Sequence, residues 1–470
     1  MRAPRHGRGR VVNVLAAPLP RLLRGGRARR MGRALPWPVL SLVGFLALII
    51  AGTALLSLPL TTQGEGRASV TDAAFTAVSA VTVTGLTVVD TAGQWNRVGE
   101  GVVLGLVQLG GLGIMTSTTF FLVLLGTRIG IRGRALARED LASPSLAAVR
   151  RFVLSIVLFT VVAEAAGFGL LYIHFGRSGP GDEGLWQAGF HAVSAFNNAG
   201  FDLLGERGFR QFQSTTWLLL VVAALVIAGG ISFSVVANIL SVRGFRRLSL
   251  NSKVVLAATL LLLAAGFAFV LGTEHGNEAT LGPLPWTQRL SSAFFQSVTS
   301  RTAGFSTLPT GALLEASLFF IIVLMFIGAA AGSTGGGIKV NTLAVLVSGV
   351  VSSLRGRPRN EAFERRIPDE QLRKALTLAS LALCLVFTAA MVLIATEGLR
   401  FLHSLFLVVS AFATVGLSPV DPSGFTLGGK VLLMAVMVAG KLGSPLLILL
   451  LARLDRPSRY DYPEERVNLA

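Results

Sequence analysis

Thr82-Val83-Thr84-Gly85-Leu86 is a short stretch that recurs three times further along the chain. The later copies are Asn197-Asn198-Ala199-Gly200-Phe201, Arg301-Thr302-Ala303-Gly304-Phe305 and Ala413-Thr414-Val415-Gly416-Leu417. Their glycines follow one another at spacings of 115, 104 and 112 residues, and ten positions before them lie Phe75, Phe190, Phe294 and Phe406. Matched stretches at similar spacing indicate a fourfold internal repeat.

Each copy has the same neighbours: a long apolar run, a short half-apolar segment, the glycine turn and a second long apolar run. This order predicts a helix, a re-entrant pore helix, a turn and a helix. Irregular backbone at membrane depth is tolerated only inside protein or beside a watery cavity. Glycine suits such a turn because it adopts positive φ without a Cβ penalty. Four turns around one axis would present a ring of carbonyl oxygens to a dehydrated cation.

A Val-Ser pair precedes the glycine by seven and six positions in three copies, at Val78-Ser79, Val193-Ser194 and Val409-Ser410. In the third copy the corresponding pair, Val298-Thr299, is shifted by one position.

The composition is that of a membrane protein that crosses the bilayer several times. The chain has 470 residues, a mean hydropathy of +0.67 and only 14% charged residues. Cys384 is the only cysteine, so an intrachain disulfide or a thiolate metal cluster is excluded. The five histidines are scattered and show no metal-ligand spacing.

The net charge of +18 is typical of a nucleic-acid partner, but its distribution argues for a membrane. Residues 1–36 hold ten arginines and no acid, and further basic clusters alternate with the apolar runs at 128–138, 243–253, 355–374 and 453–459. The positive-inside rule then places both termini in the cytoplasm. The basic tail is a candidate for binding anionic lipid, and an organellar transit peptide is a second reading of it.

The pattern divides the chain into a basic tail over 1–36, repeats over 37–127, 148–242, 253–352 and 373–452, a cytoplasmic linker over 353–372 and a polar tail over 453–470. Pore helices are expected over about 71–81, 186–196, 288–300 and 400–412. The predicted fold is an all-α membrane protein with eight spans in pseudo-fourfold arrangement around one pore. Glycine patches at Gly110-Gly111 and Gly229-Gly230 are expected to let helices approach closely.

The run Gly332-Ser333-Thr334-Gly335-Gly336-Gly337 interrupts the apolar segment that follows the third turn. Each glycine costs about 1 kcal/mol relative to alanine in a helix, so four disfavour the helix by roughly 4 kcal/mol. We therefore expect a loop inside the membrane beneath the turns, with a simple kink as the alternative. The run is no nucleotide-binding loop, because Ile338 stands where that motif has lysine.

Three charged residues lie at membrane depth, where charge is expensive and functional by default. Glu164 has two readings, a functional acid or a structural acid that ties helices together. Arg301 is expected to point away from a cation path and brace the surrounding protein. Lys441 lies between Gly440 and Gly443 in the last span, where an ammonium costs at least about 2.5 kcal/mol, and snorkelling is its alternative.

The sequence resembles the Trk/Ktr/HKT superfamily of potassium transporters, and most of all the membrane subunit of its bacterial Ktr branch. The resemblance covers nearly the whole chain from Pro36 to Leu451. It rests on TVTGLTVVD (82–90), QLGGLGIMT (108–116), FHAVSAFNNAGFD (190–202), SVTSRTAGFST (297–307), GSTGGGIK (332–339) and SAFATVGLSP (410–419).

The resemblance implies potassium uptake through a selectivity filter of backbone carbonyls at 82–85, 197–200, 301–304 and 413–416. It implies that 332–337 is a gating loop and that Lys441 is a barrier beneath the filter, where the family commonly has arginine. Glycine at all four filter positions goes with selectivity for potassium over sodium. Asp90 and Asp421 follow two turns and are read either as acids that attract cations or as ordinary loop residues.

The resemblance also implies a homodimer in the bacterial cytoplasmic membrane, regulated by a soluble ring that binds nucleotides. This chain itself shows no nucleotide site and no sign of nucleic-acid binding. The main rival is a sodium- or proton-coupled secondary cation transporter. An intramembrane enzyme would need converging catalytic groups, which Glu164, Cys384 and Lys441 do not form. A membrane scaffold would leave the four turns unexplained.

Overall fold

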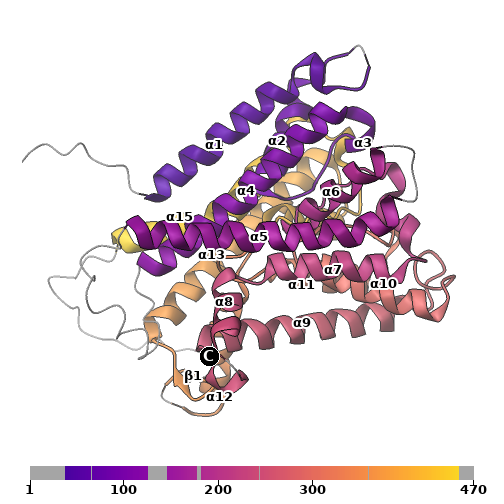
Figure 1. Cartoon of the computed structure of the whole chain (residues 1–470). Helices are drawn as coiled ribbons and strands as arrows, with labels where there is room; N and C mark the ends of the chain where they lie inside the picture. The colour runs from indigo at the N-terminus through magenta and orange to yellow at the C-terminus, as the bar shows by residue number, and fades with distance from the viewer. Residues whose placement is uncertain are drawn as a thin grey trace, which may run out of the picture.

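The computed structural model describes residues 37–64, 66–124, 146–176, 182–242, 244–357 and 359–454. The basic segment at 128–138 and nearly all of the two tails lie outside these ranges. Within them the chain is almost entirely helical, and the long helices α5 and α9 run in the same general direction (Figure 1).

The longest helices are rich in apolar residues. They are α1 (Trp37–Leu56), α4 (Arg97–Leu124), α5 (Leu146–Phe175), α9 (Leu250–Glu274), α13 (Asp369–Glu397) and α15 (Leu427–Leu454). Among the described residues, α5 from Arg150, α9 and α13 are long and apolar enough to cross a membrane by themselves. The bent pair of α7 (Thr216–Gly230) and α8 (Phe233–Ser241) makes a fourth span when it is counted as one.

Four shorter helices each end at one of the glycine turns. They are α2 (Val70–Thr82), α6 (Glu183–Phe196), α10 (Trp286–Thr299) and α14 (Phe401–Phe412). Each coincides within a few residues with a pore helix expected from the sequence, so those four helix predictions are confirmed. Most of their residues are buried, which agrees with helices that enter the protein interior rather than cover its surface.

Two helical segments are broken. The first consists of α7 (Thr216–Gly230) and α8 (Phe233–Ser241), which meet at 93°. The second consists of α11 (Glu315–Phe326) and α12 (Val340–Leu354), with the glycine run between them. The predicted loop at 332–337 is therefore confirmed, and a simple kink is excluded. The bend after Gly230 was not expected from the sequence.

The remaining elements are short. They are the helix α3 (Thr91–Gln94), the 3-10 helices η1 (Pro59–Thr61), η2 (Gly205–Phe212), η3 (Phe245–Arg247), η4 (Thr310–Ala312) and η5 (Pro422–Gly424), and the strands β1 (Glu361–Ala362) and β2 (Arg365–Arg366). The two strands pair antiparallel, Ala362 opposite Arg365. The charged linker thus contains a small hairpin. Helix α13 begins at Asp369, which lies inside the range 353–372 predicted as linker.

The hydrophobic core is built around the four short helices. Phe75, Phe190 and Phe406, which each lie ten residues before a glycine of a turn, are fully buried. In the third copy the residue at this position, Phe294, is only partly buried, and Phe295 is buried instead. This offset of one residue agrees with the shift of the Val298-Thr299 pair relative to the other three copies.

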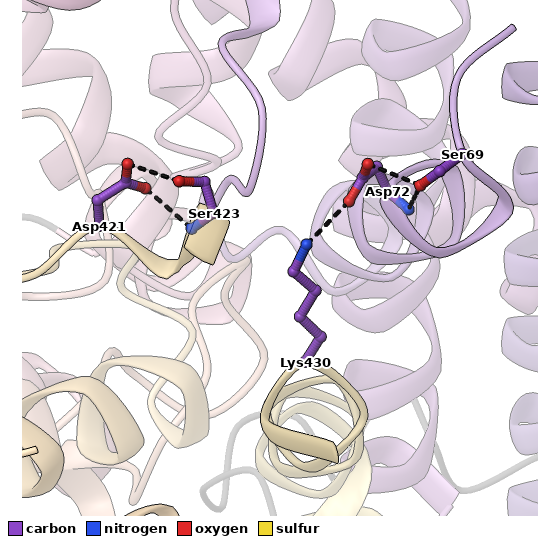
Figure 2. A network of polar contacts seen from close by, with 5 residues as sticks. All are labelled: Ser69, Asp72, Asp421, Ser423 and Lys430. Atoms are coloured by element: carbon purple, nitrogen blue, oxygen red, sulfur yellow. Dashed lines mark hydrogen bonds and ion pairs between the residues drawn. The ribbon is translucent and has the colours of Figure 1, made fainter. Parts of the chain in front are cut away.

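An ion pair joins the second described α-helix, α2, to the last described one, α15. Lys430 near the start of α15 reaches Asp72 in the first turn of α2, with 3.1 Å between Nζ and Oδ1 (Figure 2). Ser69 caps α2, because its Oγ accepts the backbone N–H of Asp72 and donates to its carboxylate. The two side chains of the ion pair are mostly buried, 13% and 24% exposed, so solvent screens this contact less than a surface pair.

Candidate functional site

Four glycines, one in each turn, meet in the interior. Gly85, Gly200, Gly304 and Gly416 have φ of 81°, 72°, 83° and 93°. A Cβ built on Gly85 would lie 2.3 Å from the carbonyl oxygen of Ala199 in the next turn. The same contact runs from Gly200 to Ala303 at 2.8 Å, from Gly304 to Val415 at 2.3 Å and from Gly416 back to Thr84 at 2.3 Å. The four turns thus form a closed ring of backbone contacts, which we call the glycine ring.

The carbonyl oxygens at these contacts are available for a ligand. No hydrogen bond among the described residues uses the carbonyl oxygen of Thr84, Ala199, Ala303 or Val415 as its acceptor. Buried backbone carbonyl groups are almost always paired, so four unpaired ones in a ring call for an explanation. Carbonyl oxygens are ligands for hard cations, and a ring of them can replace part of a hydration shell.

The end of each short helix sets the path of its turn. In three turns an N–H one residue before the glycine donates to a helix carbonyl five positions back, at 2.8 Å each: Thr84 to Ser79, Ala199 to Ser194 and Val415 to Ser410. In the third turn Ala303 donates to Thr299, four positions back, at 3.0 Å. The residue two before the glycine has positive φ in all four turns: Val83, Asn198, Thr302 and Thr414. A non-glycine residue in this conformation carries strain.

Glycines on the following helices let those helices lie against the short-helix ends. A Cβ on Gly110 would lie 2.0 Å from the carbonyl oxygen of Val81. The corresponding distance is 1.7 Å from Gly229 to Phe196 and from Gly440 to Phe412. The close approach expected at the patches that contain Gly110 and Gly229 is therefore confirmed, and Gly440 is a third example.

The residue three before each glycine is braced differently in each turn. Thr82 Oγ1 contacts Thr84 Oγ1 at 2.7 Å, and Ala413 lies against the loop residue Gly337. Arg301 is buried and donates to the carbonyl oxygens of Thr259, at 3.5 Å, and Gly328, at 3.3 Å. Arg301 also lines a cavity of about 20 Å³, room for about one water molecule. The expectation that Arg301 braces the surrounding protein is confirmed.

Asn197 occupies the same position in the second turn and belongs to a polar network. Its Nδ2 donates to Gln108 Oε1 at 2.6 Å and to Glu164 Oε1 at 3.1 Å. Gln108 Nε2 in turn donates to Glu164 Oε2 at 3.1 Å. Glu164 therefore ties α5 to α4 and to the second turn, which supports the structural reading of this acid. Asn198 beside it contacts Thr302 Oγ1 at 3.2 Å and links the second turn to the third.

The glycine-run loop lies directly against the third and fourth turns. Residues 332–337 are all buried. A Cβ on Gly335 would lie 2.3 Å from Thr302 Oγ1, and one on Gly336 would lie 2.4 Å from Thr414 Oγ1. Thr334 is anchored to the end of α7, because its N–H and Oγ1 both donate to the Gly229 carbonyl oxygen, at 3.3 and 3.0 Å.

Two lysines hold the carbonyl groups of this loop. Lys441, only 3% exposed, donates to the Thr334 carbonyl oxygen. Lys339 donates to the carbonyl oxygen of Gly335 and contacts that of Gly336. Lys441 was expected near the loop, and this contact confirms it, while snorkelling to the surface is excluded. Lys339 was missed, although its place between the glycine run and an apolar helix marks it as a charge at membrane depth.

Acids after the turns mostly have local structural roles. The Asp90 carboxylate accepts the N–H of Gly93, and the Asp421 carboxylate accepts the N–H and Oγ–H of Ser423 (Figure 2). These contacts fit ordinary loop residues that cap helices. Asp202 differs, because burial raises its pKa to about 6, the Leu204 N–H opposes the shift and the nearby Asp90 adds to it.

The side chains that commonly bind metals form no cluster within the described ranges. Among the described residues, no three His, Cys, Asp or Glu side chains converge as metal ligands. Cys384 is exposed on α13 and, as the single cysteine of the sequence, has no second thiol in the chain to pair with. Apolar helices of membrane-spanning length around a buried ring of backbone groups define an integral membrane protein with a polar centre.

The chain belongs to the TrkH family of cation transport proteins, whose family model matches residues 44–460. It is 37% identical over 430 residues to the Ktr system potassium uptake protein B of Bacillus subtilis. The alignment covers 92% of this chain and 96% of the relative. It is 38% identical over 434 residues to the potassium/sodium uptake protein NtpJ of Enterococcus hirae. That alignment covers 91% of this chain and 95% of the relative.

A solved structure has the same fold. The crystal structure of the potassium transporter TrkH from Vibrio parahaemolyticus matches with a TM-score of 0.69 at 20% identity. The match covers 91% of this chain and 87% of the other. This likeness establishes the fold of a membrane transporter, and the resemblance inferred from the sequence motifs is confirmed by the family match.

Proposed function

We propose that this protein takes up potassium ions across the bacterial cytoplasmic membrane through a pore at the glycine ring. Four tandem helix–pore-loop–helix repeats with eight spans would surround this pore in pseudo-fourfold arrangement. The observation that carries the proposal is the closed ring of four turns with unpaired carbonyl oxygens. The relatives named as potassium uptake proteins support potassium as the cargo.

In this proposal the selectivity filter consists of residues 82–85, 197–200, 301–304 and 413–416. Its carbonyl oxygens replace part of the hydration shell of a potassium ion. Glycine is needed at the ring because any side chain there would meet the backbone of the next turn. No enzymatic step is required, and the ion is cargo rather than a resident cofactor.

A single substitution with a matched control tests the filter. Gly85→Ser adds a side chain where the Ala199 carbonyl oxygen leaves no room and where φ is 81°. Gly105→Ser on the same repeat adds the same side chain in open space. We expect rubidium uptake into proteoliposomes to lose discrimination against sodium in Gly85→Ser only. Unchanged discrimination in Gly85→Ser would overturn the filter assignment.

The loop over Gly332, Ser333, Thr334, Gly335, Gly336 and Gly337 is proposed as the gate, with Lys441 as an electrostatic barrier beneath the filter. Support comes from the contact of Gly335 and Gly336 with the third and fourth turns and from the lysine contact to Thr334. A shortened loop should raise the rate of uptake. If flux does not change in a variant that lacks part of 332–337, the loop is not the barrier.

A sodium- or proton-coupled secondary transporter is the second candidate. One relative is named a potassium/sodium uptake protein, which favours sodium as a second ion. The two candidates differ in their energetics, because coupled uptake follows the gradient of the second ion. Rubidium uptake should be measured with and without a sodium gradient and with a proton ionophore. Uptake that is driven by the potassium gradient alone supports the pore.

A homodimer with both termini in the cytoplasm and a soluble nucleotide-binding ring on that side is proposed for the assembled state. The resemblance supports it, as do relatives whose names speak of a Ktr system. Membrane lipids are the surrounding partner. Light scattering of the detergent-solubilised chain would measure the oligomer, and uptake with and without the candidate ring subunit would measure its regulation.

A further inference from the structure

Glu164 is the one acidic residue that lies well inside a described membrane helix rather than near a helix end. Its two carboxyl oxygens accept separate hydrogen bonds, Oε1 from Asn197 and Oε2 from Gln108. Gln108 lies on α4, Glu164 on α5 and Asn197 at the end of α6, so one carboxyl group connects three elements. An acid well inside a membrane helix is energetically expensive, so its presence there needs a reason.

The three side chains form a closed triangle, which we call the carboxamide triad. The third side is the bond from Asn197 Nδ2 to Gln108 Oε1 at 2.6 Å. The same Nδ2 also donates to the carbonyl oxygen of Val193 at 3.0 Å, one turn back in α6. Asn197 is fully buried, and all hydrogen bonds of its side chain are made through this single nitrogen, one of whose two N–H groups is shared between two acceptors.

The other end of the Asn197 amide shows how closely the site is fitted. Its Oδ1 is buried without a hydrogen-bond partner among the described residues. A Cβ on Gly111 would lie 2.0 Å from this oxygen, so α4 presses directly on it. An unpaired buried acceptor is costly, and a reversed amide would place Nδ2 against the Gly111 backbone. The triad therefore fixes the amide in one orientation.

Asn197 lies three residues before Gly200, so its position is passed on to the glycine ring. The N–H of Asn198 and that of Ala199 bond back to α6, and Gly200 contacts Ala303 and Gly304 of the third turn. A shift of Asn197 would move the Ala199 carbonyl oxygen, which touches Gly85. The first, second and third turns would all sense this change.

We infer that Glu164, through the carboxamide triad, positions the second turn and thereby sets the preference of the pore among alkali cations. Glu164 is a positioning residue, because it acts on the ring through Asn197 rather than by contact with the ion. This inference rests on the proposed filter. It differs from a merely structural role, which would affect the amount of folded protein but not the ratio of potassium to sodium uptake.

The pattern of donors and acceptors permits a sharp test, because Glu164 and Gln108 can be exchanged. In Glu164→Gln the amide groups of residues 164 and 108 face each other and one bond is lost. In Gln108→Glu two carboxylates face each other. In the double exchange, the amide at 164 donates to the carboxylate at 108, and Asn197 again donates to both. All three bonds return, with the charge moved from α5 to α4.

The measurement is the ratio of potassium to sodium uptake in proteoliposomes, with the amount of folded chain from size exclusion. Each single variant should lower this ratio by at least about threefold, and the double exchange should restore it. Glu183→Gln is the matched control, because it makes the same change on an exposed residue of α6. Glu164→Asp, which keeps the charge but withdraws the carboxyl group, serves if a single variant does not fold.

The outcomes separate this inference from the proposed filter. Lowered ratios in the single variants and recovery in the double exchange support it. Lowered ratios without recovery overturn it, because the bond pattern would then not be the cause. Unchanged ratios in Glu164→Gln and Glu164→Asp overturn it while Gly85→Ser still shows a filter. If Gly85→Ser also leaves the ratio unchanged, the filter and this inference fall together.

Discussion

The glycine ring and the glycine-run loop both depend on glycine, but they differ in whether their carbonyl oxygens accept hydrogen bonds. In the ring, the carbonyl oxygens of Thr84, Ala199, Ala303 and Val415 have no donor within the described residues. In the loop, Lys441 and Lys339 occupy the carbonyl oxygens of three consecutive residues, Thr334, Gly335 and Gly336. The comparison teaches that glycine permits close backbone packing in both places, and that the two differ because nearby lysines donate to the carbonyl oxygens of the loop.

The largest effect is expected from a side chain in the ring. Gly416→Ala would place a Cβ 2.3 Å from the Thr84 carbonyl oxygen at a φ of 93°. Strain and overlap together should cost about 3 kcal/mol, and selective uptake should be lost. Thermal unfolding and rubidium uptake measure both effects. Gly443→Ala on the same region of chain has open space around it and should behave like the parent. Equal behaviour of the two variants would contradict the ring.

The second effect concerns the lysines of the loop. Lys441→Met removes a buried charge and a donor with little change in volume, so the maximal rate of uptake should rise several-fold. Lys339→Met should act in the same direction but less, because its contacts are within the loop and its own helix start. The two effects should be less than additive, since both residues hold one loop.

Uptake rates at saturating potassium measure this, and Lys374→Met provides the control. The side chain of Lys374 is 42% exposed and pairs with Glu370 near the start of α13, and no hydrogen bond among the described residues joins it to the loop. A fall in rate for Lys441→Met, with folded protein intact, would mean that the lysine assists conduction rather than blocks it.

The third effect is on stability. Asp72→Asn breaks the mostly buried pair with Lys430 and should destabilise the protein by about 1 kcal/mol, a loss of a few degrees at most in Tm. Glu361→Gln breaks the pair with Arg357, whose side chains are 45% and 50% exposed, and should change Tm negligibly. Thermal unfolding of both variants compares the loss of a mostly buried ion pair with the loss of an exposed one.

The smallest effect is a pH dependence at Asp202. Burial raises the pKa of Asp202 to about 6, so the group is ionised above that pH and neutral below it. An ionised Asp202 adds negative charge beside Asp90, which favours cation entry. Uptake at low potassium should therefore fall as the outside pH decreases from about 7 to about 5. Asp202→Asn should flatten this profile, and an unchanged profile would exclude Asp202 as its source.

Sequence patterns predicted most of the local structure. The four short helices, the loop at 332–337 and the close helix approach at Gly110 and Gly229 follow from glycine content and apolar periodicity, which are local properties. The position of Lys441 near the loop was implied by the family resemblance, and its hydrogen bond to the Thr334 carbonyl oxygen agrees with it. Whether the turns select potassium stays a prediction.

Long-range pairing was beyond the sequence. Asp72 and Lys430 lie 358 residues apart, and Gln108, Glu164 and Asn197 come from three elements, so their contacts depend on how the helices pack. The burial of Phe295 in place of Phe294 depends on a rotation of one residue in α10. The bend after Gly230 lies beside the Gly229 carbonyl oxygen that anchors Thr334 of the loop, a contact between segments far apart in the sequence.

The contact between Lys430 and Asp72 also has a consequence for biogenesis. A ribosome makes Asp72 early and Lys430 near the end, and α15 must enter the membrane before the two can meet. Until α15 has entered, its Gly440 cannot pack against the Phe412 carbonyl oxygen, so the end of the fourth short helix lacks this cover. Chaperones and membrane proteases would therefore meet an unfinished chain in this state, and a nascent chain that stops before α15 should be degraded rather than accumulate as a leaky pore.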